Sequence, residues 1–250
     1  MYRYVGSRAV RLTLTAALII GSGLQAASAS AHPSAGPAAA AKQDSAIVMP
    51  GATSAEGIAR GAGSTFGAAN TSIINDVALV PGGAWFTDSA QPKLYFVPVD
   101  GFGTPGPFTT LTVTGPAAHL TGDFNMNGIA AVPIGKKLIV AHSADAALYT
   151  VDPATGAIAI IAGVSVPNVD GIVLRGHRLW AVQNFSNQVS RFKLTAGFSS
   201  GTLEKVITNG LFQIPTTAAL FGDTLAVVNA KFDTGLPPTA SQYEVVLVGK

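Results

Sequence analysis

Residues 170–194 read DGIVLRGHRLWAVQNFSNQVSRFKL. A polar pair opens this stretch, an apolar run follows, and a turn centred on Gly176 leads into a second apolar run and then a third. Short apolar runs separated by glycine turns predict consecutive antiparallel β-strands. We therefore expect neighbouring strands of one sheet here, with Ile172, Leu174, Leu179 and Trp180 inside them.

The same order of features recurs in three other stretches of the chain. They read NDVALVPGGAWFTDSAQPKLYFVPVD at 75–100, NGIAAVPIGKKLIVAHSADAALYTVDPATG at 127–156 and TTAALFGDTLAVVNAKFDTG at 216–235. The four stretches begin at residues 75, 127, 170 and 216, so their starts are 52, 43 and 46 residues apart. A β-rich period of about 40 to 50 residues is typical of a four-stranded propeller blade. The sequence therefore predicts an all-β chain built as a β-propeller, with Ile129 and Ala131 in strands of the second repeat.

A fifth fragment, EGIARGAGSTF, runs from Glu56 to Phe66 and opens in the same way. Asn75 follows only 19 residues after Glu56, which leaves no room for a whole blade. We expect about four blades plus a partial one, with blade material missing between about Phe66 and Thr71. The edge before Asn75 would then lack its natural neighbour, and an open apolar edge predicts self-association.

The run Ala46–Met49 is expected to cover the other edge by pairing with Tyr243–Val248. In addition, Asn127 and Asp170 open adjacent intact repeats, so we expect these two residues to lie close together.

The composition narrows the class of protein. Charged residues make up 11% of the chain and hydrophobic residues 48%, with 28 glycines and 15 prolines. A charged share far below the usual quarter argues against a helical bundle, and the apolar share argues against disorder. The net charge is +2, but three of the basic residues lie in a segment that we expect to be removed. The remaining 12 basic and 13 acidic residues give −1, which argues against nucleic-acid binding.

Residues 1–31 have the pattern of a secretory signal peptide. Arg3, Arg8 and Arg11 precede an apolar run, and Ala-x-Ala sites end at Ala29 and Ala31. The run is shorter than the roughly 20 residues of a membrane span, although an uncleaved membrane anchor is the alternative. We expect a flexible Ala/Pro leader at 32–44, a single folded domain at 45–250, and secretion of the mature chain with no membrane contact. With no cysteine, disulfides do not hold this fold together.

Polar pairs open three of the four repeats. They are Asn75-Asp76, Asn127-Gly128 and Asp170-Gly171. One interpretation is that these are ordinary turn residues, because Asn and Asp favour turns. The other is that they start the innermost strands of successive blades, where side chains from different blades converge on the propeller axis. Recurrence at the same point of each repeat favours the second interpretation.

These motifs resemble the gluconolactonase, senescence-marker-protein and regucalcin family of six-bladed propellers. The resemblance rests on Glu-Gly at Glu56, Asn-Asp at Asn75, Asn-Gly-Ile with a later Gly-Lys-Lys-Leu at Asn127, and Asp-Gly-Ile at Asp170. It covers residues from about 45 to the C-terminus. It implies a truncated propeller of the six-bladed lactonase type.

The resemblance also implies functional residues. A divalent cation on the axis would be held by Glu56, Asn127 and Asp170, and Asn75 would contact the substrate. The family normally has one or two further blades between the first and third of these motifs. It often has arginine where this chain has Ile73.

Two carboxylates and one amide oxygen form a hard, oxygen-only site that suits calcium, magnesium or manganese better than copper. Zinc is a further candidate, and the sequence does not identify the metal. Such an ion polarises an ester or lactone carbonyl and lowers the pKa of bound water, with Asp170 as the catalytic proton acceptor. A purely structural calcium is the alternative.

Other kinds of site find less support in the sequence. The histidines show no paired spacing, and no phosphate-binding loop is present. A serine hydrolase also lacks support, because Ser54, Ser64 and Ser143 lie in no Gly-x-Ser-x-Gly elbow. Trp85 and Trp180 follow the glycine turn at equivalent points of two repeats, which indicates packing between blades. The sequence predicts a secreted metal-dependent lactone or ester hydrolase acting on a small molecule. A non-catalytic propeller that binds a ligand or a protein is the alternative.

Overall fold

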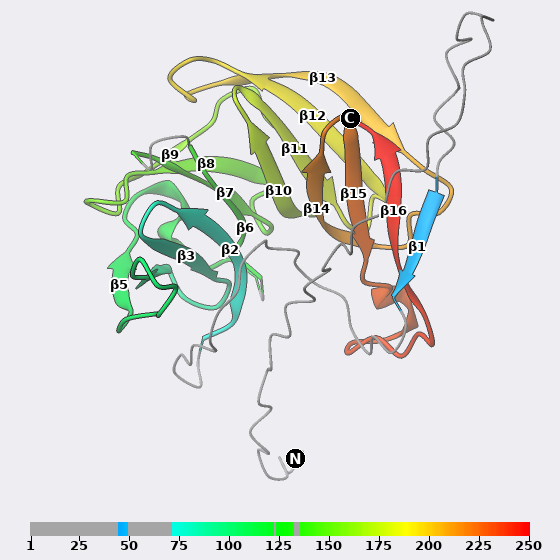
Figure 1. Ribbon diagram of the computed structural model, residues 1–250. Helices are drawn as coiled ribbons and strands as arrows, with labels where there is room; N and C mark the ends of the chain where they lie inside the picture. The colour runs from blue at the N-terminus through cyan, green and yellow to red at the C-terminus, as the bar shows by residue number, and fades with distance from the viewer. Residues whose placement is uncertain (1–44, 50–71, 123, 133–135) are drawn as a thin grey trace, which may run out of the picture.

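The computed structural model describes residues 45–49 (backbone only), 72–122, 124–132 and 136–250. Within these ranges the chain forms sixteen β-strands and two short 3-10 helices, η1 (Pro116–Ala118) and η2 (Phe232–Thr234). The strands form four antiparallel sheets of four strands each, which we number as blades one to four (Figure 1). The chain is therefore an all-β, four-bladed β-propeller arrangement, as the four sequence repeats predicted.

Each repeat supplies one blade. Blade one contains β2 (Ile74–Val80), β3 (Gly83–Asp88), β4 (Lys93–Pro98) and β5 (Thr109–Thr112). Blade two contains β6 (Met126–Ala131), β7 (Leu138–His142), β8 (Ala147–Val151) and β9 (Ile158–Ile160). Blade three contains β10 (Val169–Arg175), β11 (Arg178–Gln183), β12 (Gln188–Leu194) and β13 (Gly201–Thr208). Blade four contains β14 (Pro215–Phe221), β15 (Thr224–Asn229), β16 (Tyr243–Gly249) and β1 (Ser45–Met49).

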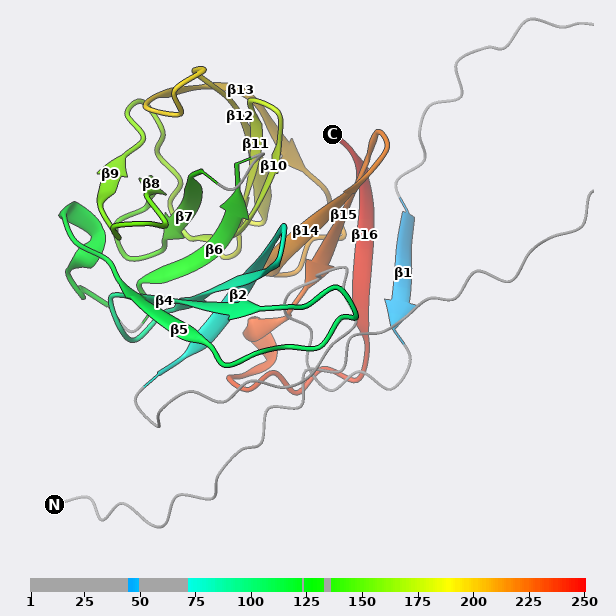
Figure 2. The same ribbon diagram turned by 60° about the vertical axis from the view of Figure 1, so that its left-hand side comes forward.

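The first strand of each repeat is the innermost strand of its blade. These inner strands, β2, β6, β10 and β14, turn toward a common axis in both views (Figure 2). Because a strand points alternate side chains to opposite faces, an inner strand can pack on both neighbouring blades. In β10, Ile172 and Leu174 pack on the core toward blade two, while Val173 packs on the core toward blade four.

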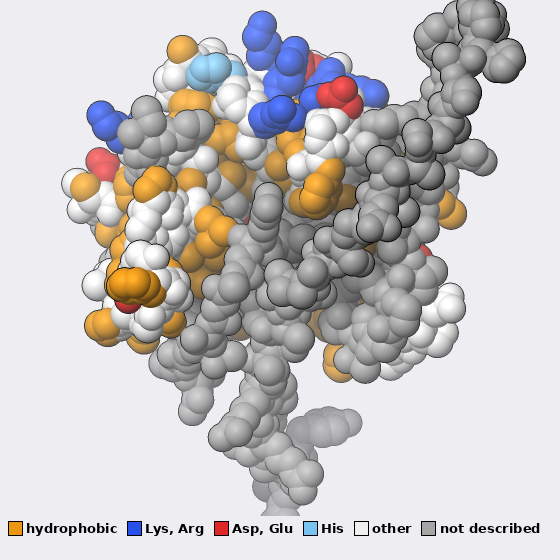
Figure 3. All heavy atoms as spheres, viewed as in Figure 1, with side chains coloured by type: hydrophobic (Ala, Val, Ile, Leu, Met, Phe, Trp, Pro, Cys, Tyr) orange, Lys and Arg blue, Asp and Glu red, His pale blue; other side chains and the backbone are white. Residues whose placement is uncertain are grey.

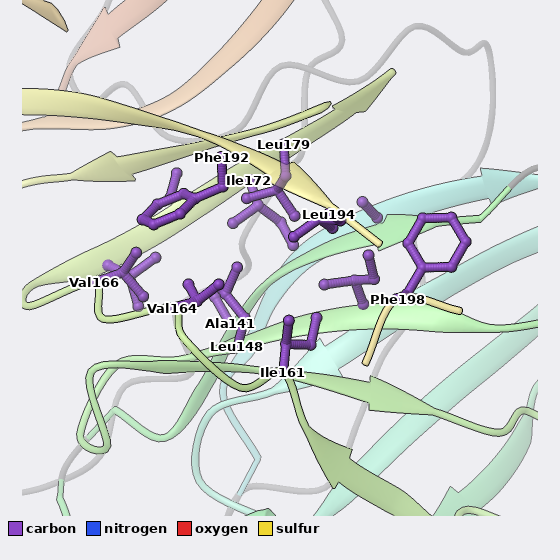
Figure 4. Close-up of a cluster of buried hydrophobic side chains, with 14 residues drawn as sticks. Ala141, Leu148, Ile161, Val164, Val166, Ile172, Leu179, Phe192, Leu194 and Phe198 are labelled. Atoms are coloured by element: carbon purple, nitrogen blue, oxygen red, sulfur yellow. The ribbon is translucent and has the colours of Figure 1, made fainter. Parts of the chain in front are cut away.

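Three buried apolar cores join consecutive blades. One lies between blades one and two, one between blades two and three, and one between blades three and four. In the second of these, Ile172, Leu179 and Phe192 of blade three face Leu148 and Ile161 of blade two (Figure 4). No equivalent core joins blade four to blade one within the described residues.

Both ends of the described chain contribute to blade four. Ala46 pairs with Val246 and Met49 with Tyr243, so β1 is the outer strand beside β16. The predicted pairing of Ala46–Met49 with the C-terminal strand is confirmed. Because main-chain hydrogen bonds now occupy one side of β16, this edge of the blade is covered.

The predicted packing role of the tryptophans is also confirmed. Trp180 is 2% exposed in the core between blades three and four, and Trp85 packs against the core between blades one and two. The partial repeat at Glu56–Phe66, the missing blade material and the N-terminal signal and leader lie outside the described residues. None of the helices in the described ranges is long and apolar enough to cross a membrane.

Candidate functional site

A bulge interrupts each inner strand at its polar opening. The pairing with the second strand shifts between Ile74 and Val77 in blade one, and the other three inner strands shift at the corresponding place. Those shifts lie at Met126/Ile129, Val169/Ile172 and Pro215/Thr217. Bulges re-aim side chains and are frequent beside functional sites. The polar side chains therefore leave the regular ladder together, at one end of the axis.

The side chains released by the bulges meet around a small cavity of about 10 Å³. We call its polar lining residues the axial polar cluster: Asn75, Asp76, Asn127, Asp170, Thr216 and Thr217. A cavity of this size holds about one water molecule or one ion. The structure thus brings together three of the sequence-predicted residues, Asn75, Asn127 and Asp170. Glu56, the fourth, lies outside the described residues.

Glycines let the inner strands approach closely enough to form this cluster. A Cβ at Gly128 would overlap the carbonyl oxygen of Asp170. A Cβ at Gly171 would lie 2.6 Å from Thr217 Oγ1 and 2.8 Å from the Thr216 carbonyl oxygen. The glycine that follows Asn127 or Asp170 in the sequence is therefore needed for contact between neighbouring blades.

A serine orients the amide of Asn127. Asn127 Nδ2 donates to Ser143 Oγ at 3.1 Å, and Ser143 Oγ donates to the carbonyl oxygen of Val169 at 2.6 Å. Since the hydroxyl has one proton and gives it to Val169, it can only accept from the amide. Asn127 Oδ1 has no hydrogen-bond partner among the described residues, although Asn127 is only 5% exposed. A buried acceptor of this kind can be satisfied by a water molecule or an ion.

Blade one repeats this arrangement. Asn75 Nδ2 donates to Ser89 Oγ at 2.9 Å, and Ser89 Oγ donates to the carbonyl oxygen of Met126 at 2.7 Å. Ser89 and Ser143 each stand directly after the second strand of their blade. In both blades this serine therefore ties the polar pair of its own blade to the inner strand of the next.

In blades three and four a different residue stands directly after the second strand. Asn184, directly after β11, donates through Nδ2 to Asp170 Oδ2 at 3.1 Å. Blade four has Ala230 there, which carries no donor, and Thr216 Oγ1 is buried without a partner. The axial polar cluster thus contains two buried oxygens, Asn127 Oδ1 and Thr216 Oγ1, for which the described part of the chain provides no hydrogen-bond partner.

Asp76 supplies a second carboxylate beside Asp170. Its Oδ1 accepts from its own neighbour, the Val77 amide, at 2.7 Å, and its Oδ2 accepts from the Ile129 amide of blade two at 3.1 Å. Thr87 Oγ1 donates to the Asn127 carbonyl oxygen at 2.7 Å and accepts from the Asp76 amide. The carboxylate of Asp76 is therefore held at the junction of blades one and two. Among the described residues, no lysine or arginine lines the cavity.

Sequence reasoning assigned no role to Asp76, Thr216 or Thr217, and it overlooked the residues that orient the cluster. The sequence contains a pattern that could have identified these orienting residues. The second strand of each blade ends on a polar residue, and in the first three blades the next residue is polar as well. The four pairs are Asp88-Ser89, His142-Ser143, Gln183-Asn184 and Asn229-Ala230. The first residue of each pair is at most 2% exposed.

A second polar group lies around His142 in blade two. Asp145 accepts a hydrogen bond from Tyr149 OH at 2.8 Å, and its Oδ1 lies 3.1 Å from His119 Nε2. Burial raises the pKa of Tyr149 to about 12, helped by Asp145, so this phenol remains a proton donor. Burial lowers the pKa of His142, against the opposing effect of Asp145, which favours a neutral ring. Among the described residues, no three His, Asp or Glu side chains gather as a metal site.

Comparison with known proteins finds only distant structural likeness. No family model matches the sequence, and no curated protein matches it. Virginiamycin B lyase from Staphylococcus aureus superposes with a TM-score of 0.46 at 13% identity, covering 70% of this chain and 52% of that one. The Malassezia sympodialis allergen Mala s 1 gives 0.49 at 18% identity, with 70% and 55% covered. A protein from Lactobacillus plantarum gives 0.47 at 21% identity, with 63% and 48% covered. The chain thus spans about half the length of these propeller-like structures.

Proposed function

We propose that the axial polar cluster binds one divalent cation, and that the protein is a secreted metal-dependent hydrolase of small lactones or esters. One observation carries the cation site. Asn127 Oδ1 and Thr216 Oγ1 are buried, with no donor among the residues that the structure describes, and they lie with two carboxylates around a cavity that fits a single ion. Burying unsatisfied oxygens costs free energy, and a bound cation offsets that cost.

The residues present fit a hard cation. Asn127 and Asp170 would hold it, with Asp76 and Thr216 as further oxygen donors, and Glu56 as the third ligand that the family resemblance implies. This donor set suits calcium, magnesium or manganese, and zinc remains to be compared with them. When bound, the ion supplies polarisation of a carbonyl and a lower pKa for water.

The remaining catalytic roles fall to side chains of this chain. Asp170 accepts a proton from the attacking water, and Asn184 keeps its carboxylate in position through Oδ2. Asn75, anchored by Ser89, contacts the substrate. Because Ser143 fixes the amide of Asn127, its Oδ1 stays directed at the site and does not have to reorient when the ion binds.

A non-catalytic role for the cation is the second candidate. The cavity of about 10 Å³ holds an ion but no substrate, and residues from all four inner strands line it. A cation here would join the four blades at their axis, as a structural calcium does. The protein would then act as a binding propeller.

Metal binding and turnover separate these candidates. We suggest elemental analysis of the purified full chain before and after chelation, followed by calorimetric titration with calcium, manganese and zinc. Asp170→Ala should abolish binding, whereas Asp152→Ala, which removes a carboxylate from an exposed turn, should not. A panel of lactones and esters is then assayed with each metal. Binding without turnover selects the structural role, and unchanged affinity in Asp170→Ala removes this residue from the site.

Secretion has its own test. Export of the chain from an expression host, with an N-terminus that begins after Ala29 or Ala31 by mass spectrometry, is the expected result. An intact N-terminus on a membrane-bound product would contradict it.

A further inference from the structure

A larger cavity of about 360 Å³ lies along the four inner strands, next to their later halves. Small side chains make the room: Ala78, Ala130, Ala131, Ala218 and Ala219 line it. Bulkier apolar residues, including Ile172 and Leu174, complete the wall. Ligand sites in proteins commonly have volumes of about 300–1,000 Å³ and are mainly apolar. This cavity, which is open to solvent, falls within that volume range, and apart from Arg175 its described lining residues are apolar.

Among the described residues, one charged side chain lines this cavity. Arg175 is an exposed residue at the end of β10, and its Nη1 donates to the Gly222 carbonyl oxygen at 3.0 Å, which brings the guanidinium beside the turn between β14 and β15. Within the described residues Arg175 forms no ion pair with a carboxylate, and no acidic residue lines the cavity. Lys and Arg side chains also gather at the top of the view in Figure 3, near the C-terminus.

The apolar lining reaches the surface at Leu79, which lines the cavity and is 53% exposed. A hydrocarbon chain in the cavity would remove this side chain and the alanines from water. Among the described residues, the lining offers no side-chain partner for hydroxyl groups other than Arg175, so a sugar would lose hydrogen bonds to water without replacing them.

We propose that this cavity binds a medium-chain aliphatic carboxylate, with the hydrocarbon chain along the inner strands and the carboxylate on Arg175. A guanidinium pairs with a carboxylate through two parallel hydrogen bonds, which sets the direction of the ligand. The apolar wall then supplies affinity in proportion to the buried chain. This site uses no residue of the axial polar cluster and does not depend on the proposed hydrolase activity.

The test is calorimetric titration of the full chain with decanoate below its micelle concentration, with decanol, decyltrimethylammonium and acetate as comparison ligands. Decanoate should bind most tightly, and acetate should not bind. Arg175→Gln should weaken decanoate by about tenfold and leave decanol unchanged. Lys205→Gln, which removes a positive charge from the outer strand β13, should leave both unchanged.

A second variant probes the apolar part. Ala219→Phe fills the cavity and should abolish binding of decanoate and decanol, and a thermal melt shows whether the variant is folded. If that variant does not fold, the ligand series and Arg175→Gln still decide the question. Absence of decanoate binding, equal affinity in Arg175→Gln, or tighter binding of decyltrimethylammonium would each overturn the proposal.

Discussion

The two ends of the axis are built by the same four strands and differ in almost every property. At the bulged end, Asn, Asp and Thr side chains surround a cavity of about 10 Å³. At the other end, regular pairing resumes and alanines surround a cavity large enough for an organic molecule. The difference shows that the bulge sets the chemistry of the axis, because it separates the polar opening of each strand from its apolar remainder.

The largest effect should follow from crowding the polar end. Gly171→Val places a side chain against the Thr216 carbonyl oxygen and Thr217 Oγ1, and neither strand can move without opening the core between blades three and four. We expect a loss of about 3 kcal/mol in the free energy of unfolding, measured by urea denaturation. Gly101→Val is the control, because a Cβ added at Gly101 would have no neighbouring atom within 4 Å. Equal stability of the two variants would show that the inner strands are not in close contact.

A charge at the apolar end of the axis should reduce the free energy of unfolding by less than Gly171→Val does. Leu174 is partly buried against the core between blades two and three and also lines the large cavity. Because it keeps some contact with water, Leu174→Asp should lose about 2 kcal/mol, less than a fully buried charge would. Leu174→Asn separates the effect of charge from that of lost packing. A thermal melt equal to that of the parent would mean that this end of the axis is not apolar.

Removing the hydroxyl that holds the Asn127 amide tests the polar end of the axis without changing the apolar end. Ser143→Ala deletes the hydroxyl that holds the amide and bonds to Val169, at a cost of about 1 kcal/mol. We expect weaker cation binding with an intact fold and unchanged decanoate binding. Ser186→Ala removes a partly exposed serine that accepts from Asn168 and serves as the matched control. Cation affinity that is the same in both variants would show that Ser143 does not orient the site.

The smallest expected effect is a dependence of stability on pH. His142 is buried beside the polar end, and burial holds its pKa below the value of 6.5 that it has when unfolded, although Asp145 opposes this shift. As the pH falls below about 6.5, the unfolded chain takes up a proton first, so stability decreases. Above about pH 6.5 the ring is neutral in both states, so His142 causes no loss of stability there.

Thermal melts at about pH 7.5 and about pH 5.5 test this dependence. His142→Gln, the residue type that blade three has at Gln183, should reduce the difference between the two conditions. His119 and Asp145 also face His142, so His119→Gln is measured alongside. A pH dependence identical in His142→Gln and the parent would contradict the assignment.

The blades could be predicted from the sequence because each strand has a local sequence pattern. Alternation and glycine turns located the strands around Ile129, Ile172 and Trp180, and the match between Ala46–Met49 and the C-terminal run predicted the last pairing. These features depend on neighbours along the chain, or on one complementary strand, and need no knowledge of the axis.

The site was predicted only in part for a physical reason. Asn75, Asn127 and Asp170 were found because they open their repeats. Asp76 was placed in the polar pair that opens the first repeat but was given no role, yet its carboxylate accepts from the Ile129 amide, a contact that exists only when two blades pack. Likewise, Ser143 matters because its hydroxyl reaches the strand of the next blade. Contacts of this kind follow from how blades stack, which local patterns do not encode.

The pairing of β1 with β16 also bears on how the chain is made. β1 leaves the ribosome early, and its partner is the strand farthest from it in the described sequence. At about 5–20 residues per second, the intervening chain takes on the order of tens of seconds to synthesise. Blade three, whose strands are consecutive, can form during this interval, whereas blade four must wait until β16 has been made. The last blade to form is therefore the one that joins the two ends of the described chain, and a chain that lacks β16 would leave β1 without its partner.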